Sequence, residues 1–235
     1  MNRRLQYLEA LEIDAWTPRG GFARTAQLIA TPPGNGAAGA DTASWDELAA
    51  QVRSCTRCGL HATRTQTVFG VGNRRAELMV IGEAPGADED AQGEPFVGRA
   101  GQLLNSILRG MGWPRETVFI ANVLKCRPPG NRDPAPEEAA SCRPYLQAQI
   151  DLVQPRMLLA VGRIAAQNLL ATETPIGKLR GHVHRFGAGG IPLVVTYHPA
   201  YLLRSPGEKR KVWSDMKLLR AELARARSDT TAPGH

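Results

Sequence analysis

Four short hydrophobic runs alternate along the chain with longer segments in which apolar residues recur at helical spacing. The runs cover residues 78–81, 118–124, 157–161 and 193–197. The helical segments cover residues 99–111, 136–152, 163–171 and 207–227. Continuous apolar runs of this length are typical of strands that are buried on both faces. The alternation therefore predicts an α/β fold with three layers, α/β/α, around a central, mostly parallel four-stranded sheet.

The two ends of the chain depart from this pattern. Leu5, Leu8 and Leu11 lie at helical spacing, and residues 17–43 then become rich in Thr, Pro, Gly and Ala, which is typical of a linker. The sequence therefore predicts three parts. They are an N-terminal helix with a flexible linker over residues 1–44, one domain over residues 45–227 and a frayed tail over residues 228–235. The N-terminal extension is a candidate docking element for a protein partner.

Composition narrows the class of protein only modestly. The 235 residues carry 29 Lys and Arg against 22 Asp and Glu, a formal net charge of +7, which suits a polyanionic partner without identifying one. No stretch approaches the roughly 18 apolar residues that a membrane span needs. Residues 1–20 mix charged and apolar side chains, unlike a secretory signal. We therefore expect a cytoplasmic, monomeric protein that does not enter a membrane.

The four cysteines are Cys55, Cys58, Cys126 and Cys142. Cys55 and Cys58 form a C-x2-C pair that can place two thiolates on one centre. Cys126 follows a predicted strand and Cys142 lies on the next predicted helix, so these two could approach each other. Cysteines in a reducing compartment indicate metal or redox chemistry before disulfides. Four thiolates suit tetrahedral zinc or a [4Fe–4S] cluster, and the absence of a second C-x2-C pair tilts slightly toward a cluster. Free buried cysteines are the simpler alternative.

Polar residues follow each predicted strand, where ligands bind in open parallel sheets. The segment GEAPGADED, residues 82–90, follows the first strand, and PFVGR, residues 95–99, comes shortly after it. Neither segment contains the glycine pattern of a dinucleotide site or of a Walker A loop. The carboxylates of residues 82–90 would repel phosphates, so they suit acid–base work, water positioning or metal binding. A solvated acidic loop is the simpler alternative.

Taken together, these segments resemble the iron–sulfur uracil-DNA glycosylases, family 4 of the uracil-DNA glycosylase superfamily. The resemblance spans roughly residues 45–225. It is carried by the Cys55/Cys58 pair, residues 82–86, residues 95–101, residues 122–126, Cys142 and residues 198–200. It implies hydrolysis of the N-glycosidic bond of uracil in DNA, which is the first step of base-excision repair. It also implies a structural [4Fe–4S] cluster held by all four cysteines, and uracil-containing DNA as the partner.

The resemblance also assigns roles to residues around the base. A base must leave the helix before an enzyme can reach its glycosidic bond, and flipping costs a few kcal/mol. Phe96 would stack on the flipped ring. The amide of Asn122 can pair with N3–H and O4 of uracil, whereas cytosine presents the reverse pattern. His198 would donate a hydrogen bond to O2 of uracil, where negative charge develops.

The resemblance leaves two candidates for the carboxylate that acts on the sugar and the water. Glu83 is the first candidate for stabilising the cation-like sugar and positioning water, and Glu89 is the second. Ala84 stands where better-known uracil glycosylases carry Asp, and Gly86 stands where other families use Tyr to exclude the methyl group of thymine. Both positions are expected to bind the base. We hypothesise that the loop of Asp88 and Glu89 fills the gap beside Gly86.

Basic residues near the C-terminus are candidates for contacts with the DNA backbone. The predicted DNA contacts are Arg180, Leu202, Arg204, Lys209 and Arg210. Leu202, or alternatively Leu203, would wedge into the base stack, although core packing explains either leucine equally well. A solvated helix face is the alternative for the basic residues.

Two other functions remain open at this point. A relative that traps its product covalently on a histidine carries an inserted basic loop, which this chain lacks, although His182 and His184 follow a basic segment. A non-enzymatic nucleic-acid-binding module would keep the cysteines and basic patches. It would not need Phe96, Asn122 and His198 together.

Overall fold

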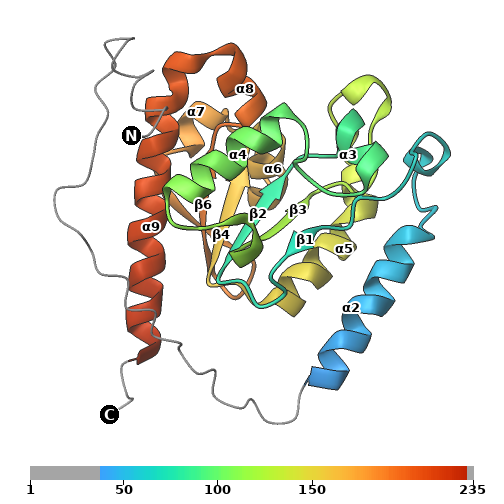
Figure 1. Cartoon of the computed structure of the whole chain (residues 1–235), viewed down its shortest axis with the longest axis horizontal. Helices are drawn as coiled ribbons and strands as arrows, with labels where there is room; N and C mark the ends of the chain where they lie inside the picture. The colour runs from blue at the N-terminus through green and yellow to red at the C-terminus, as the bar shows by residue number, and fades with distance from the viewer. Residues whose placement is uncertain (1–37, 232–235) are drawn as a thin grey trace, which may run out of the picture. The chain divides into compact units, whose positions relative to one another are not determined.

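The computed structural model describes residues 38–231, and a single sheet of six strands lies at its centre (Figure 1). The strands are β1 (Val71–Gly72), β2 (Leu78–Gly82), β3 (Phe119–Asn122), β4 (Met157–Val161), β5 (Val183–Phe186) and β6 (Ile191–Thr196). Their order across the sheet is β1-β3-β2-β4-β6-β5. The four predicted runs are β2, β3, β4 and β6, and these four strands are parallel. The predicted fold class is therefore confirmed.

The predicted strand count of four is wrong, because β1 and β5 add antiparallel edges to the parallel centre. β1 has only two residues, one of them a glycine. β5 carries His184 and Arg185 and is not fully buried. Edge strands are commonly short or charged, which protects an open edge from pairing with other chains. The same features remove the continuous apolar run by which the central strands were found.

Helices cover both faces of the sheet. Those that match predicted segments are α4 (Arg99–Gly110), α5 (Pro136–Val153), α6 (Arg163–Leu170) and α9 (Lys209–Thr231). Those that the sequence did not predict are α2 (Ala38–Arg53), α3 (Ala87–Gln92), α7 (Ile176–Leu179) and α8 (Pro199–Arg204). The 3-10 turns are η1 (Gly59–Ala62), η2 (Arg115–Thr117), η3 (Pro129–Asn131) and η4 (Pro206–Glu208).

The helices at the two ends differ from the predicted boundaries. α2 begins inside the predicted linker, and α9 continues past residue 228 into the predicted frayed tail. The predicted N-terminal helix and the rest of the linker lie outside the described residues. None of the described helices is long and apolar enough to cross a membrane.

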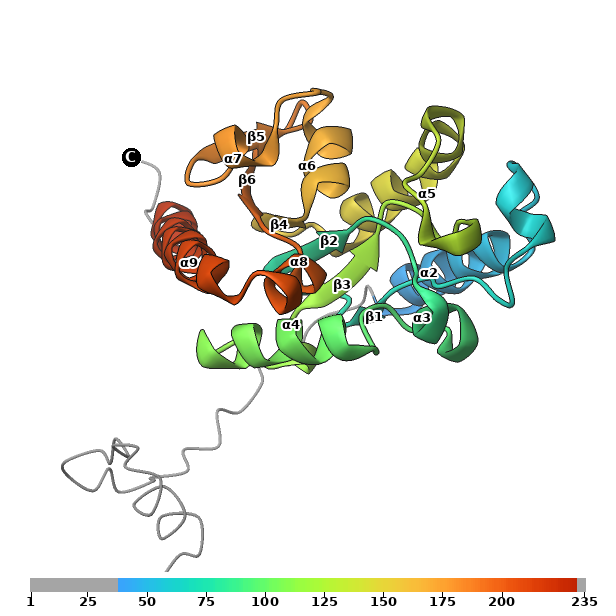
Figure 2. The ribbon, with the colours of Figure 1, turned by 90° about the horizontal axis from the view of Figure 1, so that it is seen from above.

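Alternate side chains of the central strands build two separate cores. In β2, Met79 and Ile81 pack with α5, α6 and α7 on one face. Leu78 and Val80 pack with α4, α8 and α9 on the other face. Figure 2 shows α4 and α9 on one side of the sheet and α5 and α6 on the other. The three-layer arrangement is thus the packing solution for strands that are apolar on both faces.

The parallel strands end at one edge of the sheet, and their register brings four polar segments together there. Gly82 at the end of β2 pairs with Asn122 at the end of β3. Val161 at the end of β4 pairs with Thr196 at the end of β6. The segments after these four residues therefore share one end of the sheet, as expected for an open α/β fold.

Candidate active site

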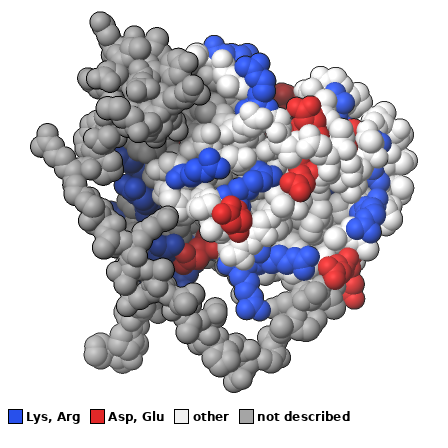
Figure 3. Space-filling model, in the orientation of Figure 1, with Lys and Arg blue, Asp and Glu red and all other residues white. Residues whose placement is uncertain are grey.

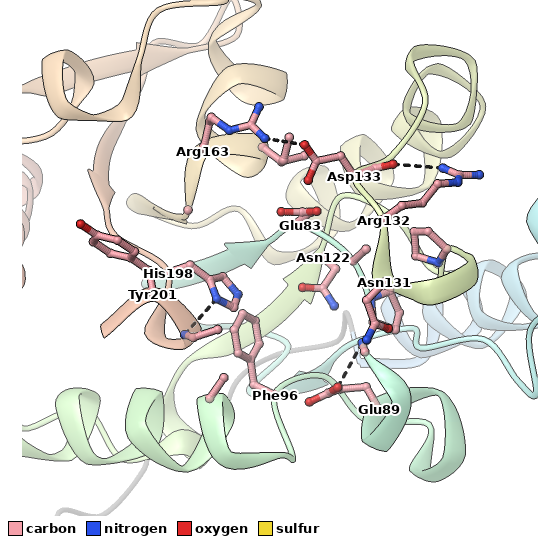
Figure 4. A pocket seen from close by; sticks show the side chains of 18 of the residues that line it. Glu83, Glu89, Phe96, Asn122, Asn131, Arg132, Asp133, Arg163, His198 and Tyr201 are labelled. Atoms are coloured by element: carbon pink, nitrogen blue, oxygen red, sulfur yellow. Dashed lines mark hydrogen bonds and ion pairs between the residues drawn. The ribbon is translucent and has the colours of Figure 1, made fainter. Parts of the chain in front are cut away.

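A cavity of about 820 Å³ lies at the carboxyl ends of the parallel strands (Figure 4). All the catalytic and base-binding residues predicted from the sequence line it, together with one predicted DNA contact: Glu83, Ala84, Gly86, Glu89, Phe96, Asn122, His198 and Arg204. A cavity of this size can hold a nucleobase with part of its sugar, since ligand pockets commonly span about 300–1,000 Å³.

Asn122, which lines this cavity, carries an unsatisfied acceptor. The residue is only 2% exposed, and its side-chain oxygen Oδ1 is buried without a hydrogen-bond partner among the described residues. Gly82 makes room for it, because a Cβ atom there would lie 2.4 Å from Asn122 Oδ1 and 2.5 Å from Phe96 Cζ. A buried acceptor left unpaired costs about 1–3 kcal/mol, which a ligand with a matching N–H would recover.

Phe96 lines the cavity in a strained conformation. Its φ of +55° lies in the left-handed region, which costs of order 1–3 kcal/mol for a residue other than glycine. Arg115, from the turn η2, donates from Nη1 to the carbonyl of Phe96 at 3.4 Å and from Nη2 to that of Pro95 at 2.5 Å. Gly101 permits the close approach, since a Cβ there would lie 1.8 Å from the Phe96 carbonyl oxygen. Arg115 was not predicted, because nothing in its local sequence signals this contact.

Both carboxylate oxygens of Glu89 are occupied by the backbone. Oε1 accepts hydrogen bonds from the amides of Val97 at 2.9 Å and Gly98 at 3.2 Å. Oε2 accepts one from the amide of Gly86 at 3.1 Å. Glu89 thereby ties the loop after β2 to the loop that carries Phe96. Asp90 has a comparable structural use, because it accepts from the amide of Thr65.

The carboxylate of Glu83, by contrast, accepts no hydrogen bond from any described residue. Burial and, to a smaller extent, the negative charge of Asp133 raise its pKa to about 7, although the positive charge of Arg163 opposes both. Asp133 and Arg163 form an ion pair at 2.5 Å, and both residues line the cavity beside Glu83 (Figure 4). A carboxylic acid that titrates near neutral pH, inside a cavity, is suited to acid–base work.

His198 is held as a neutral ring with a defined tautomer. Burial lowers its pKa to about 4, the charge of Arg204 adds to this effect, and Glu89 opposes it. Its Nδ1 accepts a hydrogen bond from the amide of Ala200 at 3.2 Å, so the ring proton is on Nε2. Gly162, with φ of +98°, lets α6 begin close to the ring, because a Cβ there would lie 3.1 Å from His198 Cβ.

The structure corrects one predicted DNA contact on α8. Leu202 is fully buried in the core between α4 and α9, so the prediction that it wedges into DNA is wrong. Its neighbour Leu203, the alternative considered with it, is 40% exposed. Arg204 is exposed and lines the cavity. Lys209 and Arg210 are exposed as well, but they border an apolar groove with Trp213 instead of the cavity.

Arg180 is also used differently from the prediction. Its guanidinium forms an ion pair with the fully buried Asp215 at 2.8 Å and donates to the carbonyl of Lys211 at 2.7 Å. It also lies over the ring of Tyr197, 5.3 Å from the centroid. A buried carboxylate that loses its partner is strongly destabilising, so Arg180 serves the fold and is not available to DNA phosphates.

The rim of the cavity carries polar residues to which the sequence assigned no role: Asn131, Arg132, Asp133 and Arg163. The first three come from η3 and the segment between it and α5, and Arg163 begins α6 just after β4. Their position in the segments that follow β3 and β4 is the sequence signal that could have identified them. The face drawn in Figure 3 shows Lys and Arg interspersed with Asp and Glu where described atoms are visible, and no single basic field. Net charge therefore does not locate a nucleic-acid surface here.

All four cysteines line a second, small cavity. None forms a disulfide. Arg64 donates to Sγ of Cys126 at 3.1 Å, and the amide of Lys125 donates to Sγ of Cys142 at 3.3 Å. Among the described residues, no group of three or more His, Cys, Asp or Glu could hold a single metal ion. Four thiol donors around one cavity, with hydrogen bonds to sulfur, are the donor set that a [4Fe–4S] cluster or a tetrahedral zinc ion uses.

Comparison with known proteins agrees with this geometry. The family model described as the uracil DNA glycosylase superfamily matches residues 69–217, and the chain belongs to this superfamily. A type-4 uracil-DNA glycosylase of Archaeoglobus fulgidus is 46% identical over 180 residues, covering 74% of this chain and 90% of the relative. A type-4 enzyme of Thermotoga maritima is also 46% identical, over 156 residues, covering 66% and 81%. A third, from Saccharolobus solfataricus, is 40% identical over 186 residues, covering 76% and 86%. Within the superfamily, these relatives are all of type 4.

Proposed function

We propose that this protein is a uracil-DNA glycosylase, which flips uracil out of DNA, hydrolyses its N-glycosidic bond and leaves an abasic site. The unpaired Oδ1 of Asn122 is the observation that carries the proposal. Uracil offers N3–H to this acceptor, and its O4 can accept from Asn122 Nδ2. Cytosine has an acceptor at N3 and an amino group at C4, so both contacts would be lost. Such a mismatch in a buried site can discriminate by about 10⁴-fold.

His198 supplies the stabilisation of the leaving base. Its Nε2–H donates to O2 of uracil, where negative charge accumulates as the glycosidic bond breaks. A neutral ring with its proton already on Nε2 needs no rearrangement when the charge appears, which is the advantage of an oxyanion-hole donor.

Glu83 supplies the negative charge that stabilises the cation-like sugar, and it positions the attacking water. Glu83 is favoured over Glu89 for this role, because the two carboxylate oxygens of Glu89 already accept three backbone hydrogen bonds. Glu89 is a positioning residue that fixes the loop of Phe96. Its carboxylate also occupies the space beside Gly86, which supports the hypothesis that it helps exclude the methyl group of thymine.

The cysteine cavity would hold a structural [4Fe–4S] cluster through Cys55, Cys58, Cys126 and Cys142. When bound, the cluster supplies a cross-link between the segment after α2, the segment that joins β3 to α5, and α5 itself. Binding of a metal centre contributes directly to folding free energy. Iron and zinc content of the purified protein, measured by elemental analysis, tests this assignment. Stoichiometric zinc without iron would overturn it.

DNA would approach over the rim that carries Arg132, Arg163 and Arg204. Arg204 has no ion-pair partner among the described residues, so it is the best candidate for a phosphate contact. The covalent-trapping alternative has little support, because neither His182 nor His184 lines the cavity. Whether the protein is monomeric, cytoplasmic and bound to a partner through its N-terminal extension stays a prediction.

The test is a glycosylase assay on a labelled oligonucleotide with one uracil, followed by alkali to cleave abasic sites. Asn122→Ala should excise uracil at least about 100-fold more slowly than wild type. Asn168→Ala is the matched control, since its amide only donates to the carbonyl of Ile164 in α6. No cleavage by iron-loaded wild type would favour a binding module. A stable protein–DNA adduct would favour the covalent relative.

A further inference from the structure

A lysine is buried directly behind the uracil-reading residue. Lys125 is only 1% exposed, yet no described carboxylate pairs with it. Its ammonium donates instead to two neutral acceptors, the carbonyl of Asn122 at 2.8 Å and Oε1 of Gln149 at 2.6 Å. Burying a cation without a carboxylate partner is expensive, although the sulfur of Cys142 interacts favourably with its charge, and apolar residues of similar volume are often at least as stable. The contacts that Lys125 makes therefore require an explanation beyond stability.

Gln149 fixes the position of the ammonium. It is fully buried on α5, and its Nε2 donates to the carbonyl of Phe69 at 2.8 Å. The side chain of Gln149 thus has its oxygen turned to Lys125 and its nitrogen turned away, which sets the orientation of the amide without ambiguity. A chain of hydrogen bonds runs from Phe69 through Gln149 and Lys125 to the peptide of Asn122.

The backbone of Lys125 connects the same residue to the cysteine cavity. Its amide donates to Sγ of Cys142 at 3.3 Å, and its carbonyl accepts from the amide of Val68 at 2.8 Å. The segment between Asn122 and Cys126 is therefore held at both ends, by the ammonium at Asn122 and by sulfur contacts at the cysteines.

The peptide that Lys125 holds is the one that carries the base-reading amide. β3 ends at Asn122. The amide of Val123 donates a hydrogen bond to the carbonyl of Gly82, and the amide of Leu124 donates one to the carbonyl of Glu83. Without the ammonium, the Asn122 carbonyl would lose its side-chain donor in a buried site. The peptide would then be held on its amide side alone, through the Val123 N–H, so it could tilt and Asn122 Oδ1 would move with respect to the base. A displacement of about 1 Å in a positioning group can lower a rate by about 100-fold.

We propose that Lys125 is a positioning residue for uracil recognition, which holds the Asn122 carbonyl and so aims the Asn122 amide into the cavity. Gln149 is its support. The inference rests on the proposed function and deepens it: the uracil contact of Asn122 depends on a buried network that reaches α5 and the cysteine cavity.

The experiment compares full-length Lys125→Met with wild type. Methionine has similar length and no donor. We expect kcat on a uracil oligonucleotide to fall by about 10-fold to 100-fold, while KM changes by less than about threefold, because phosphate contacts dominate DNA affinity. Preference for uracil over cytosine should weaken as well. Iron content per chain should match that of wild type. Lys178→Met, on an exposed residue of α7, controls for the lost charge.

A second variant keeps the proposal testable if Lys125→Met fails to fold. Gln149→Leu leaves the lysine in place but removes its support, and it should lower kcat in the same direction by a smaller factor. The double variant, Lys125→Met with Gln149→Leu, should be no slower than Lys125→Met alone, because the effects of substitutions within one network are not additive. Unchanged kcat and base preference per iron-loaded molecule would overturn the proposal. Failure of wild type to excise uracil would overturn the proposed function instead, so the two failures are distinguishable.

Discussion

The ring of Phe96 lies against the imidazole of His198, with ring centroids 5.7 Å apart and planes inclined by 30°. The residue proposed to stack on the base and the residue proposed to stabilise its negative charge are therefore direct neighbours. Phe96 comes from the loop before α4 and His198 from the segment after β6, with β3 and β4 between them in the chain. Both lie at the same end of the sheet, so a base placed on Phe96 is within reach of His198.

The first prediction concerns His198, the proposed hydrogen-bond donor to O2 of uracil. His198→Ala should lower kcat for uracil excision by about 10²–10³-fold, the usual effect of removing one oxyanion-hole donor. KM should change little, because the contact strengthens as charge develops. His182→Ala, exposed and outside the cavity, is the matched control. Single-turnover rates on a uracil oligonucleotide measure the effect. Equal rates for wild type and His198→Ala would remove the histidine from the mechanism.

The second prediction is a pH profile set by Glu83. Its pKa of about 7 means that only part of the population is ionised at neutral pH. If the carboxylate form is required, the single-turnover rate rises with pH and levels off above pH 7. The neutral His198 adds no further limb in this range, because its pKa is lowered to about 4. Glu83→Gln should excise slowly and show no limb near pH 7. A limb that persists in this variant would assign the titration elsewhere.

The same shift predicts a change in stability. The pKa of Glu83 is higher in the folded protein than its ordinary value of 4.5, so the folded state binds more protons between pH 4.5 and 7. The free energy of unfolding contributed by this group therefore falls as pH rises through that window. The difference in Tm between Glu83→Gln and wild type should therefore be more positive at pH 8 than at pH 4.5. Thermal unfolding at both pH values measures the difference. The opposite order would contradict the raised pKa.

The third prediction separates the two candidate carboxylates. Glu89→Ala leaves three loop amides without their acceptor, so it should lower the free energy of unfolding by about 1–3 kcal/mol. It should also reduce the preference for uracil over thymine, because it empties the space beside Gly86. Paired assays on uracil and thymine oligonucleotides measure this preference. If the preference is unchanged, the hypothesis that Glu89 excludes the methyl group fails.

The fourth prediction concerns the strain at Phe96. Arg115→Met removes both hydrogen bonds to the carbonyls of Pro95 and Phe96. The ring should then leave its place beside His198 more often, and kcat/KM should fall by about 10-fold. Arg115→Lys should not restore it, since an ammonium lacks the planar fork. Arg109→Met, exposed on α4, is the control for charge. Full activity of Arg115→Met would show that Gly101 and Glu89 suffice to hold the loop.

Sequence reasoning was most successful where a local pattern records burial. The four central strands are continuous apolar runs because helices cover both faces, and their polar ends mark the site. The residues Glu83, Phe96, Asn122 and His198 lie together because parallel strands end at one edge of a sheet. The edge strands β1 and β5 escaped prediction, since partial exposure replaces the apolar run by glycine or charge.

The chain's sequence by itself determined the α/β class, the order of the motifs and the set of cysteines, because each depends on residue type and short spacing. Only the tertiary structure decided which polar residues are free for chemistry. Arg180 is taken by Asp215, Glu89 by three loop amides, and Lys125 by Asn122 and Gln149. The decisive partners come from different elements of the fold, and no periodic pattern records a contact between a charge and its distant partner. Burial and partner together determine whether an ionisable residue supports the fold or acts on a substrate.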